Sequence, residues 1–458
     1  MFLVPPSAAS AVPLSLLGET ELERWLHQQA PSAAHWVRAS GFSAKAGEVC
    51  IVPDSSGGFA QVVLGQSKSP SLWDWAAAPP HLPEGLYRLE TLLSPWEACQ
   101  AALAWALASY RFERYRTETT AVPKLVWPEA CRAEAVERAA AAVFFARDLI
   151  NTPADDLGPE ELAAAAGDVA GRYGAQLAII TGEALIAHNY PAVYAVGRAS
   201  SRPPCLIDLR WGDPDAPKLT LVGKGVCFDT GGLDVKPASA MKLMKKDMGG
   251  AAITLALAQM VMDAALPVRL RLLIPAVDNA IAGNALRPFD IIRTRKGLTV
   301  EIGHTDAEGR VILADALTEA ASESPDLMID IATLTGAARV ALGTELPALF
   351  CNDDETATAA LAAATAVEDP LWRLPLWGPY RRHIKGKTAD LTNAPDLPYA
   401  GAITAALFLG EFAAPVCPWL HLDVMAWNTS AQPGRPEGGE AHALRALFEL
   451  IERRFAHE

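Results

Sequence analysis

The chain has 458 residues, of which 51% are hydrophobic and 20% charged, and its formal net charge is -14. This length exceeds what one hydrophobic core usually organises, so we expect more than one domain of ordinary globular composition. The negative charge repels phosphate backbones on average, which argues against nucleic acid as the main ligand.

The sequence lacks signals for export, membrane insertion and disulfide formation. No apolar run reaches the roughly 18 residues of a transmembrane helix, and the amino terminus lacks the basic start and apolar centre of a signal peptide. We therefore expect a cytoplasmic protein without membrane contact. The seven cysteines include no C-x-x-C pair and fit reduced thiols, not a disulfide framework or a zinc ribbon.

Residues 1–125 are predicted to form a separate α/β domain. Apolar runs predict strands at 47–54, 58–65 and 85–91, and a helical pattern covers 94–112. The proline-punctuated segment 117–131 is typical of a linker. Because this part contains no cluster of acids or histidines, we expect the chemistry to lie in the second domain, residues 126–458.

The second domain is predicted to have a mostly parallel central sheet covered by helices. It begins with a helix over 132–152, and Pro159 opens another helix with acids in its first turn. Apolar runs with little polar alternation then predict strands at 177–182, 203–211, 218–225, 268–277, 327–336 and 419–427. The fold class is therefore α/β, and ligands are expected beyond the carboxyl ends of the strands.

Four carboxylates occur where strands are predicted to end and helices to begin. Asp306 and Glu308 are one residue apart, so in an extended segment both side chains would point the same way. Asp229 follows a glycine-flanked strand, and Asp247 precedes Gly249 and a long apolar helix. Each acid alone is more often a solvated loop residue or a helix cap. Four such acids gathered at one sheet edge repel one another, so the set predicts a site for divalent metals.

Three basic residues accompany these acids. Lys224 stands between two glycines at a strand end, where it either extends into solvent or, as a neutral amine, ligates a metal. Lys236 is better interpreted as a cation that stabilises a developing oxyanion. Arg310 stands at a predicted helix start, which favours a small anion that could act as a base.

Other catalytic patterns are absent from the sequence. It contains no H-E-x-x-H motif, no phosphate-binding loop and no G-x-S-x-G elbow. His421, Cys227 and Cys417 lie in apolar runs and are interpreted as core residues. Oxygen-rich coordination permits zinc, manganese, magnesium or cobalt, so the identity of the metal stays open.

Several long blocks of the chain resemble the cytosolic leucyl aminopeptidase family. The block at 304–317, HTDAEGRVILADAL, is similar to the NTDAEGR signature of that family. Four further blocks are similar to family segments in the same order: VGKGVCFDTGG, KPASAMKLMKKDMGGAA, DIATLTGA and GAITAALFL. The resemblance covers residues from about 110 to 430. It implies a macro-like amino-terminal domain, a catalytic carboxyl-terminal domain and assembly into a homohexamer.

The resemblance also implies a set of metal ligands. The tighter metal would be held by Lys224, Asp229, Asp247 and Glu308. The more exchangeable metal would be held by Asp229, Asp306 and Glu308. The ions would be Mn2+ or Zn2+ with a bridging water or hydroxide, and the reaction would remove the first residue from peptides that have a free amino terminus.

Roles for the residues around the substrate follow from the same resemblance. Lys236 would polarise the scissile carbonyl, and Arg310 would hold a bicarbonate that takes the proton from the nucleophile. The backbone around Leu334 would bind the peptide. Met244 and Thr335 would lie near the first side chain of the substrate.

Three departures from the family pattern bear on function. His304 replaces the signature asparagine, and we expect altered hydrogen bonding with retained activity, because the acids two and four positions on are kept. Phe289 replaces a glycine and puts the local loop geometry in question. Met425 and Ala426 stand where small residues shape the pocket for the first side chain, so we expect a narrower pocket than one that accepts leucine.

Two alternative functions stay open at this point. A dipeptidase of the same chemistry would differ only in substrate length. A hexameric scaffold or nucleic-acid-binding protein with secondary peptidase activity is disfavoured, because charged residues buried without a role are costly and the whole charged set is present.

Overall fold

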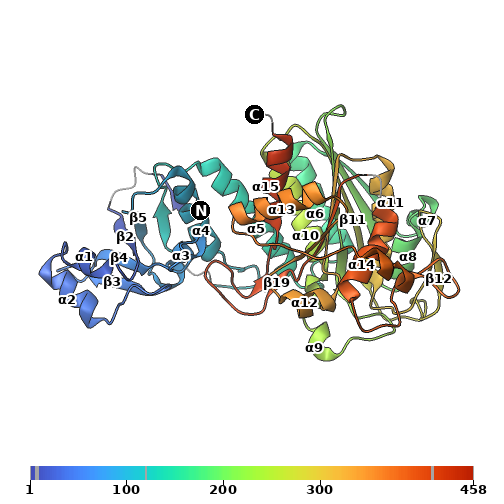
Figure 1. Cartoon of the computed structure of the whole chain (residues 1–458), viewed down its shortest axis with the longest axis horizontal. Helices are drawn as coiled ribbons and strands as arrows, with labels where there is room; N and C mark the ends of the chain where they lie inside the picture. The colour runs from blue at the N-terminus through green and yellow to red at the C-terminus, as the bar shows by residue number, and fades with distance from the viewer. Residues whose placement is uncertain (1, 6–9, 119–120, 414–416, 457–458) are drawn as a thin grey trace. The chain divides into compact units, whose positions relative to one another are not determined.

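The computed structural model describes residues 2–5, 10–118, 121–413 and 417–456 (Figure 1). The chain divides into two compact units. Unit 1 comprises residues 1–144 and 430–437, and unit 2 comprises residues 145–429 and 438–458. Each unit has its own sheet and helices, so the predicted two-domain α/β fold is confirmed.

Unit 1 is built on a six-stranded sheet with the order β1-β6-β5-β2-β4-β3. Its strands are β1 (Leu3–Val4), β2 (Val12–Leu17), β3 (Val49–Pro53), β4 (Phe59–Gly65), β5 (Leu86–Leu89) and β6 (Lys124–Val126). Its helices are α1 (Leu22–Leu26), α2 (Pro31–Ala39), α3 (Leu72–Ala76), the 3-10 turn η1 (Pro79–His81) and α4 (Pro95–Ser109). The segment predicted to be a linker thus supplies a strand, because Leu125 and Val126 pair with β1. Residues 119 and 120 of this predicted linker segment lie outside the described residues.

Unit 2 contains a nine-stranded sheet with the order β16-β15-β18-β14-β9-β11-β8-β7, and β10 pairs with β11. Its strands are β7 (Gln176–Thr181), β8 (Cys205–Trp211), β9 (Lys218–Gly223), β10 (Gly225–Asp229), β11 (Arg269–Asn279), β14 (Leu327–Ala332), β15 (Ala348–Cys351), β16 (Trp372–Arg373) and β18 (Trp419–Asp423). The central strands β18, β14, β9 and β11 are parallel, whereas β15 and β8 run antiparallel to their inner neighbours. The carboxyl ends of the four parallel strands therefore meet at one edge.

Two small sheets complete the strand inventory of unit 2. The first has the order β12-β13-β17, and the second pairs β19 with β20. Their strands are β12 (Ile291–Arg293), β13 (Thr299–Glu301), β17 (Leu391–Thr392), β19 (Trp427–Asn428) and β20 (Gly438–Gly439).

Helices cover both faces of the large sheet. The helices after unit 1's α4 are α5 (Ala133–Asn151), α6 (Pro159–Tyr173), α7 (Ala184–Ala187), α8 (Pro191–Gly197), α9 (Ala238–Met241), α10 (Gly249–Asp263), α11 (Glu308–Ser322), α12 (Gly336–Leu342), α13 (Asp354–Ala366), α14 (Gly401–Ala413) and α15 (Leu444–Phe455), with 3-10 helices η2 (Met244–Met248) and η3 (Gly378–Ile384). Figure 1 shows α10, α13 and α15 on one side of the strands and α8, α11 and α14 on the other.

The central helix α10 is buried over nearly its whole length, which explains a sequence that is apolar all round instead of on one stripe. Such a helix fits only in the interior, where it packs against the sheet and against α15. In the part of the chain that the structure describes, no helix is both long and apolar enough to cross a membrane.

Candidate metal centre

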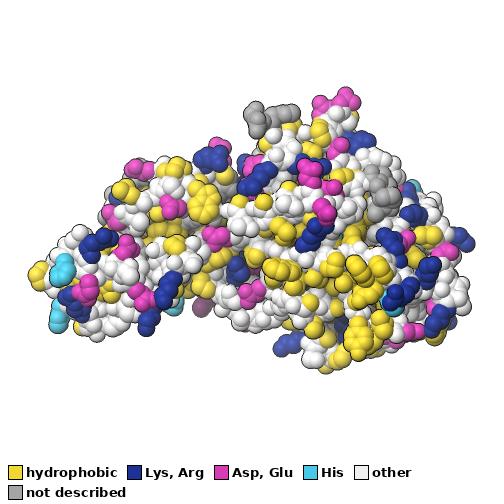
Figure 2. All heavy atoms as spheres, in the orientation of Figure 1, with side chains coloured by type: hydrophobic (Ala, Val, Ile, Leu, Met, Phe, Trp, Pro, Cys, Tyr) yellow, Lys and Arg dark blue, Asp and Glu magenta, His cyan; other side chains and the backbone are white. Residues whose placement is uncertain are grey.

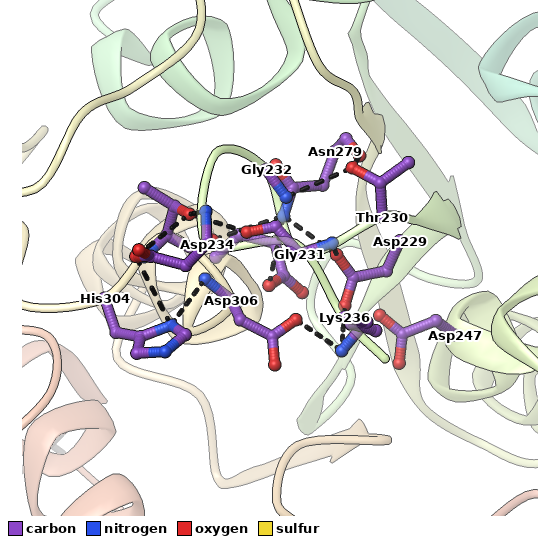
Figure 3. A network of polar contacts seen from close by, with 12 residues as sticks. Asp229, Thr230, Gly231, Gly232, Asp234, Lys236, Asp247, Asn279, His304 and Asp306 are labelled. Carbon is purple, nitrogen blue, oxygen red and sulfur yellow. Dashed lines mark hydrogen bonds and ion pairs between the residues drawn. The ribbon is translucent and has the colours of Figure 1, made fainter. Parts of the chain in front are cut away.

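The carboxylates predicted from the sequence come together at the carboxyl edge of the large sheet (Figure 3). Asp229 is the last residue of β10, and Asp247 lies in η2, which leads into α10. Asp306 lies in the turn before α11, and Glu308 is the first residue of α11. The expected extended segment around Asp306 is thus absent, and a turn followed by a helix start is what brings these two acids to one site.

Three of the acids lie close enough to share one cation. One oxygen atom from each of Asp229, Asp306 and Glu308 lies within 4.8 Å of the others. Asp229 and Glu308 are each only 2% exposed, and Asp247 is 3% exposed. Water therefore screens these charges poorly, and a bound cation would interact with them strongly.

Lys224 lies among the buried acids. Its Nζ is 2.7 Å from Asp247 Oδ2 and 3.1 Å from Glu308 Oε1. Burial opposes the charge of the ammonium, but Asp247, Glu308 and Asp229 outweigh burial and hold its pKa above the usual value. The protein alone therefore does not favour the neutral amine that a metal ligand requires, and a metal ion would have to displace the proton.

Lys236 holds the other two acids together. Its Nζ is 2.7 Å from Asp229 Oδ2 and forms an ion pair with Asp306 (Figure 3). Its side chain is 12% exposed and lines a cavity. Lys236 therefore lines the same cavity as the acids with which it pairs.

Burial and crowding make two of the four acids, Glu308 and Asp229, harder to ionise. Burial raises the pKa of Glu308 to about 8, and the nearby Asp229 adds to this shift. Burial and the charge of Asp247 raise the pKa of Asp229 to about 6. Four carboxylates face two lysines, so the cluster accommodates further positive charge. Its oxygen donors and one amine suit divalent metals of hard or borderline character.

Neighbouring residues hold the acids in position. Asn279, the last residue of β11, donates from Nδ2 to Asp229 Oδ1 at 2.8 Å, and the Gly231 backbone donates to the same oxygen at 2.8 Å. Gly231 has φ +91° and a Cβ there would lie 2.5 Å from a backbone oxygen, so this turn requires glycine. Thr333 Oγ1 donates to Asp247 Oδ1 at 2.8 Å. The sequence analysis missed Asn279, whose only signal is a polar residue at the end of a buried strand.

Arg310, in the first turn of α11, lines the same cavity. Its Nη1 donates to the Asn393 carbonyl oxygen at 2.6 Å, whereas its Nε is buried and has no hydrogen-bond partner among the described residues. Burial lowers the pKa of the guanidinium to about 10, so the group stays charged at neutral pH. A small anion would satisfy this unpaired donor.

The cavity beside the acids has a volume of about 330 Å³, and three of the predicted substrate residues, Met244, Leu334 and Thr335, line it. Met425 is 8% exposed, and its Sδ accepts a hydrogen bond from Arg339 Nη1 at 3.2 Å. Met425 therefore contacts a residue of the cavity wall, Arg339, and is not itself among the lining residues.

The departures at His304 and Phe289 have clear structural outcomes. His304 Nδ1 accepts a hydrogen bond from the Asp306 backbone N at 3.1 Å, so the histidine supports the turn that carries this acid. Phe289 has φ 67°, the left-handed conformation that glycine adopts most easily, and its side chain is 72% exposed. A phenylalanine in this conformation strains the backbone at position 289, and the Phe289 ring lies mostly in solvent.

Two basic residues that the sequence analysis did not single out also line the cavity. Lys246 precedes Asp247 in η2 and is 2% exposed, and Arg339 lies in α12. Burial lowers the pKa of Lys246 to about 8, so at neutral pH most molecules carry this side chain in its protonated form. The sequence showed only a second lysine beside an aspartate, and no local pattern indicated that it points inward.

Fold and site together define a class: an α/β protein whose parallel strands end at an acid-rich cavity suited to divalent metals, as in metal-dependent hydrolases. Residues 144–448 match the model of the cytosol aminopeptidase family, catalytic domain, and residues 12–128 match the M17 aminopeptidase, N-terminal domain. The chain belongs to the cytosol aminopeptidase family. The resemblance found in its sequence is confirmed, and the protein is an aminopeptidase-type hydrolase.

Individual relatives agree with this assignment. A probable cytosol aminopeptidase of Syntrophotalea carbinolica is 43% identical over 364 residues, which cover 76% of this chain and 73% of the relative. Peptidase B of Pectobacterium atrosepticum is 46% identical over 319 residues, 68% of this chain and 73% of the relative. The crystal structure of a cytosol aminopeptidase from Coxiella burnetii matches with a TM-score of 0.96, 50% identity and 99% coverage of each chain. The bottromycin maturation enzyme BotP, solved in complex with Mn, matches with a TM-score of 0.88 and 35% identity over 98% of this chain and 100% of that one.

Proposed function

We propose that the protein removes the amino-terminal residue from peptides with two divalent cations held in the acidic cluster. The observation that carries this proposal is the convergence of Asp229, Asp306 and Glu308 within 4.8 Å at a cavity of an aminopeptidase-family chain. Buried acids this close repel one another unless cations are bound. The relative solved with Mn supports manganese, and zinc accepts the same donors.

The two cations share ligands in this proposal. Lys224, Asp229, Asp247 and Glu308 would hold the tighter ion, and Asp229, Asp306 and Glu308 would hold the more exchangeable one. Mn2+ or Zn2+ at these positions supplies Lewis-acid activation of water and of the scissile carbonyl. Lys224 would hold an ion only as the neutral amine, with its proton released to solvent.

Residues at the cavity wall act on the substrate. The Lys236 ammonium donates to the carbonyl oxygen and stabilises the negative charge that develops there. Arg310 holds a bicarbonate at its unpaired Nε and thereby places a base beside the attacking water. The backbone around Leu334 binds the peptide through a group other than Leu334 N, which already donates to Asp423 Oδ1 at 2.9 Å.

Hydrolysis of amino-acid anilides by the full-length protein tests this function. We expect hydrolysis that requires added Mn2+, is lost with a chelator and returns when Mn2+ is restored. Amino-acetylated anilides are the matched control, because blocking the free amine is expected to prevent cleavage. A chelator-treated protein that keeps full activity would contradict the proposal.

The same preparation separates the alternative functions. Comparable rates on Leu-Gly and on longer peptides that begin with leucine are expected of an aminopeptidase, whereas cleavage of the dipeptide alone would show a dipeptidase. A gel shift with duplex DNA at physiological salt tests the nucleic-acid alternative, and the net charge of -14 leads us to expect no shift.

A homohexamer and a cytoplasmic location complete the proposal. Figure 2 shows hydrophobic side chains gathered on unit 2 over α12 and α14. Val340 in α12 is 90% exposed and Tyr399, just before α14, is 71% exposed, which is typical of a surface that contacts protein. Light scattering is expected to give six times the mass of one chain. A single-chain mass at micromolar concentration would refute the hexamer.

A further inference from the structure

The cavity carries more positive charge than the proposed chemistry uses. Beyond Lys224, Lys236 and Arg310, it is lined by Lys246 and Arg339. Lys246 is 2% exposed, in η2, and Arg339 is partly buried, in α12. Both border the cavity that Met244 and Thr335 also line.

Neither of these two cations has a carboxylate at ion-pairing distance among the described residues, in contrast to Lys224 and Lys236. Arg339 Nη1 donates to the Met425 thioether at 3.2 Å, which is a weak acceptor. The Lys246 ammonium makes no hydrogen bond in the described part of the chain. An ammonium that lines the cavity with no protein anion beside it favours an anionic group in the ligand.

Nearby acids do not supply that anion. Asp423 uses its carboxylate for other donors: Oδ1 accepts from Leu334 N at 2.9 Å and from Thr335 N at 3.1 Å, and Oδ2 accepts from the Thr335 hydroxyl. Asp247 pairs with Lys224 instead. Two divalent cations would in any case neutralise the four acids of the metal centre, so that centre does not need Lys246.

We propose that Lys246 and Arg339 select peptides whose first residue is acidic. This inference rests on the proposed function, because Met244 and Thr335 mark the place of the first side chain only if the peptide amine lies at the metal centre. The substrate carboxylate supplies the missing anion and makes charge-assisted hydrogen bonds to both cations. An apolar first side chain leaves Lys246 buried without a partner, which lowers its rate of cleavage.

Paired anilides of glutamate and glutamine test the proposal, because they differ in charge and hardly in size. With the manganese-loaded full-length protein we expect kcat/KM for the glutamate anilide to exceed that for the glutamine anilide by at least about tenfold. This factor corresponds to the free energy of one hydrogen bond between charged groups. Lys246→Met is expected to reduce this ratio at least about tenfold. Arg339→Gln is expected to reduce it as well.

The ratio of kcat/KM for the glutamate anilide to kcat/KM for the glutamine anilide distinguishes lost selectivity from a general loss of active protein. Lost metal or poor folding lowers both rates and leaves the ratio unchanged, and methionine suits a buried position that lysine occupied. Lys245→Met is the matched control, because Lys245 donates to the Asn151 carbonyl oxygen and lies over the Trp427 ring, outside the cavity lining. It is expected to keep the wild-type ratio.

The possible results separate the two proposals. Cleavage of leucine anilide with no preference for glutamate over glutamine, or a ratio that Lys246→Met leaves unchanged, would overturn the acidic selectivity and leave the peptidase function standing. No cleavage of any anilide in the presence of Mn2+ would overturn the proposed function and the selectivity with it.

Discussion

Glu308→Gln is expected to lower kcat/KM for an amino-acid anilide by at least about a thousandfold, since metal ions contribute several kcal/mol to such transition states. Glu308 is proposed to bind both cations, and it is 2% exposed at the first position of α11. Glutamine keeps the shape but removes the charge that a divalent ion needs. The variant should therefore also bind less manganese per chain.

Metal content measured by atomic emission after dialysis, together with anilide kinetics, checks this prediction. Glu319→Gln is the matched control: it lies on the same helix and pairs with Arg271 and Arg295, away from the cavity lining. It is expected to keep both the metal and the rate. A Glu308→Gln protein with two manganese ions per chain and a wild-type rate would refute the assignment of Glu308 as a shared ligand.

The two lysines explain why four acids can lie close together at the edge of the sheet. Lys224 pairs with Asp247 and Glu308, and Lys236 pairs with Asp229 and Asp306. The ammonium groups thus offset the repulsion among the acids and occupy the oxygens for which a cation would compete. This compensation is incomplete, because burial and mutual repulsion still raise the pKa of Glu308 and of Asp229.

The sequence predicted the large sheet and the place of the site because both depend on local patterns. Apolar runs located β9, β11, β14 and β18, and parallel strands necessarily present their carboxyl ends at one edge. Asp229 follows the predicted strand at 218–225, so its place at this edge followed from topology, whereas the strand before Asp306 is β13 of a small separate sheet and was not predicted. The reason given for Asp306 and Glu308 was wrong, since a helix start and not an extended segment positions Glu308.

Contacts between distant segments could not be predicted in this way. Asn279 reaches Asp229 from 50 positions away, and Arg147 forms a buried ion pair with Glu440 across 293 positions. Periodicity indicates which face of an element is buried but not which partner it meets. The inward placement of Lys246 likewise depends on contacts with distant segments. Its own segment, η2, is a short 3-10 helix without an amphipathic pattern that could indicate which side is buried.

Lys236→Met is expected to reduce kcat about 100- to 1,000-fold, the usual effect of removing one donor to a developing oxyanion, with a smaller change in KM. Metal binding should not weaken, because the Lys236 ammonium competes with cations for Asp229 and Asp306. This variant therefore separates rate from metal content, whereas Glu308→Gln loses both.

Separate measurement of kcat and KM, with a manganese titration of the same sample, distinguishes these cases. Lys242→Met is the control, because Lys242 is exposed and outside the cavity lining, and it should match the wild type in rate and in metal affinity. If Lys236→Met lost manganese along with its rate, Lys236 would be an organiser of the metal site. An unchanged kcat would instead remove Lys236 from the chemistry, because a group that donates to the oxyanion must affect the step in which that charge forms.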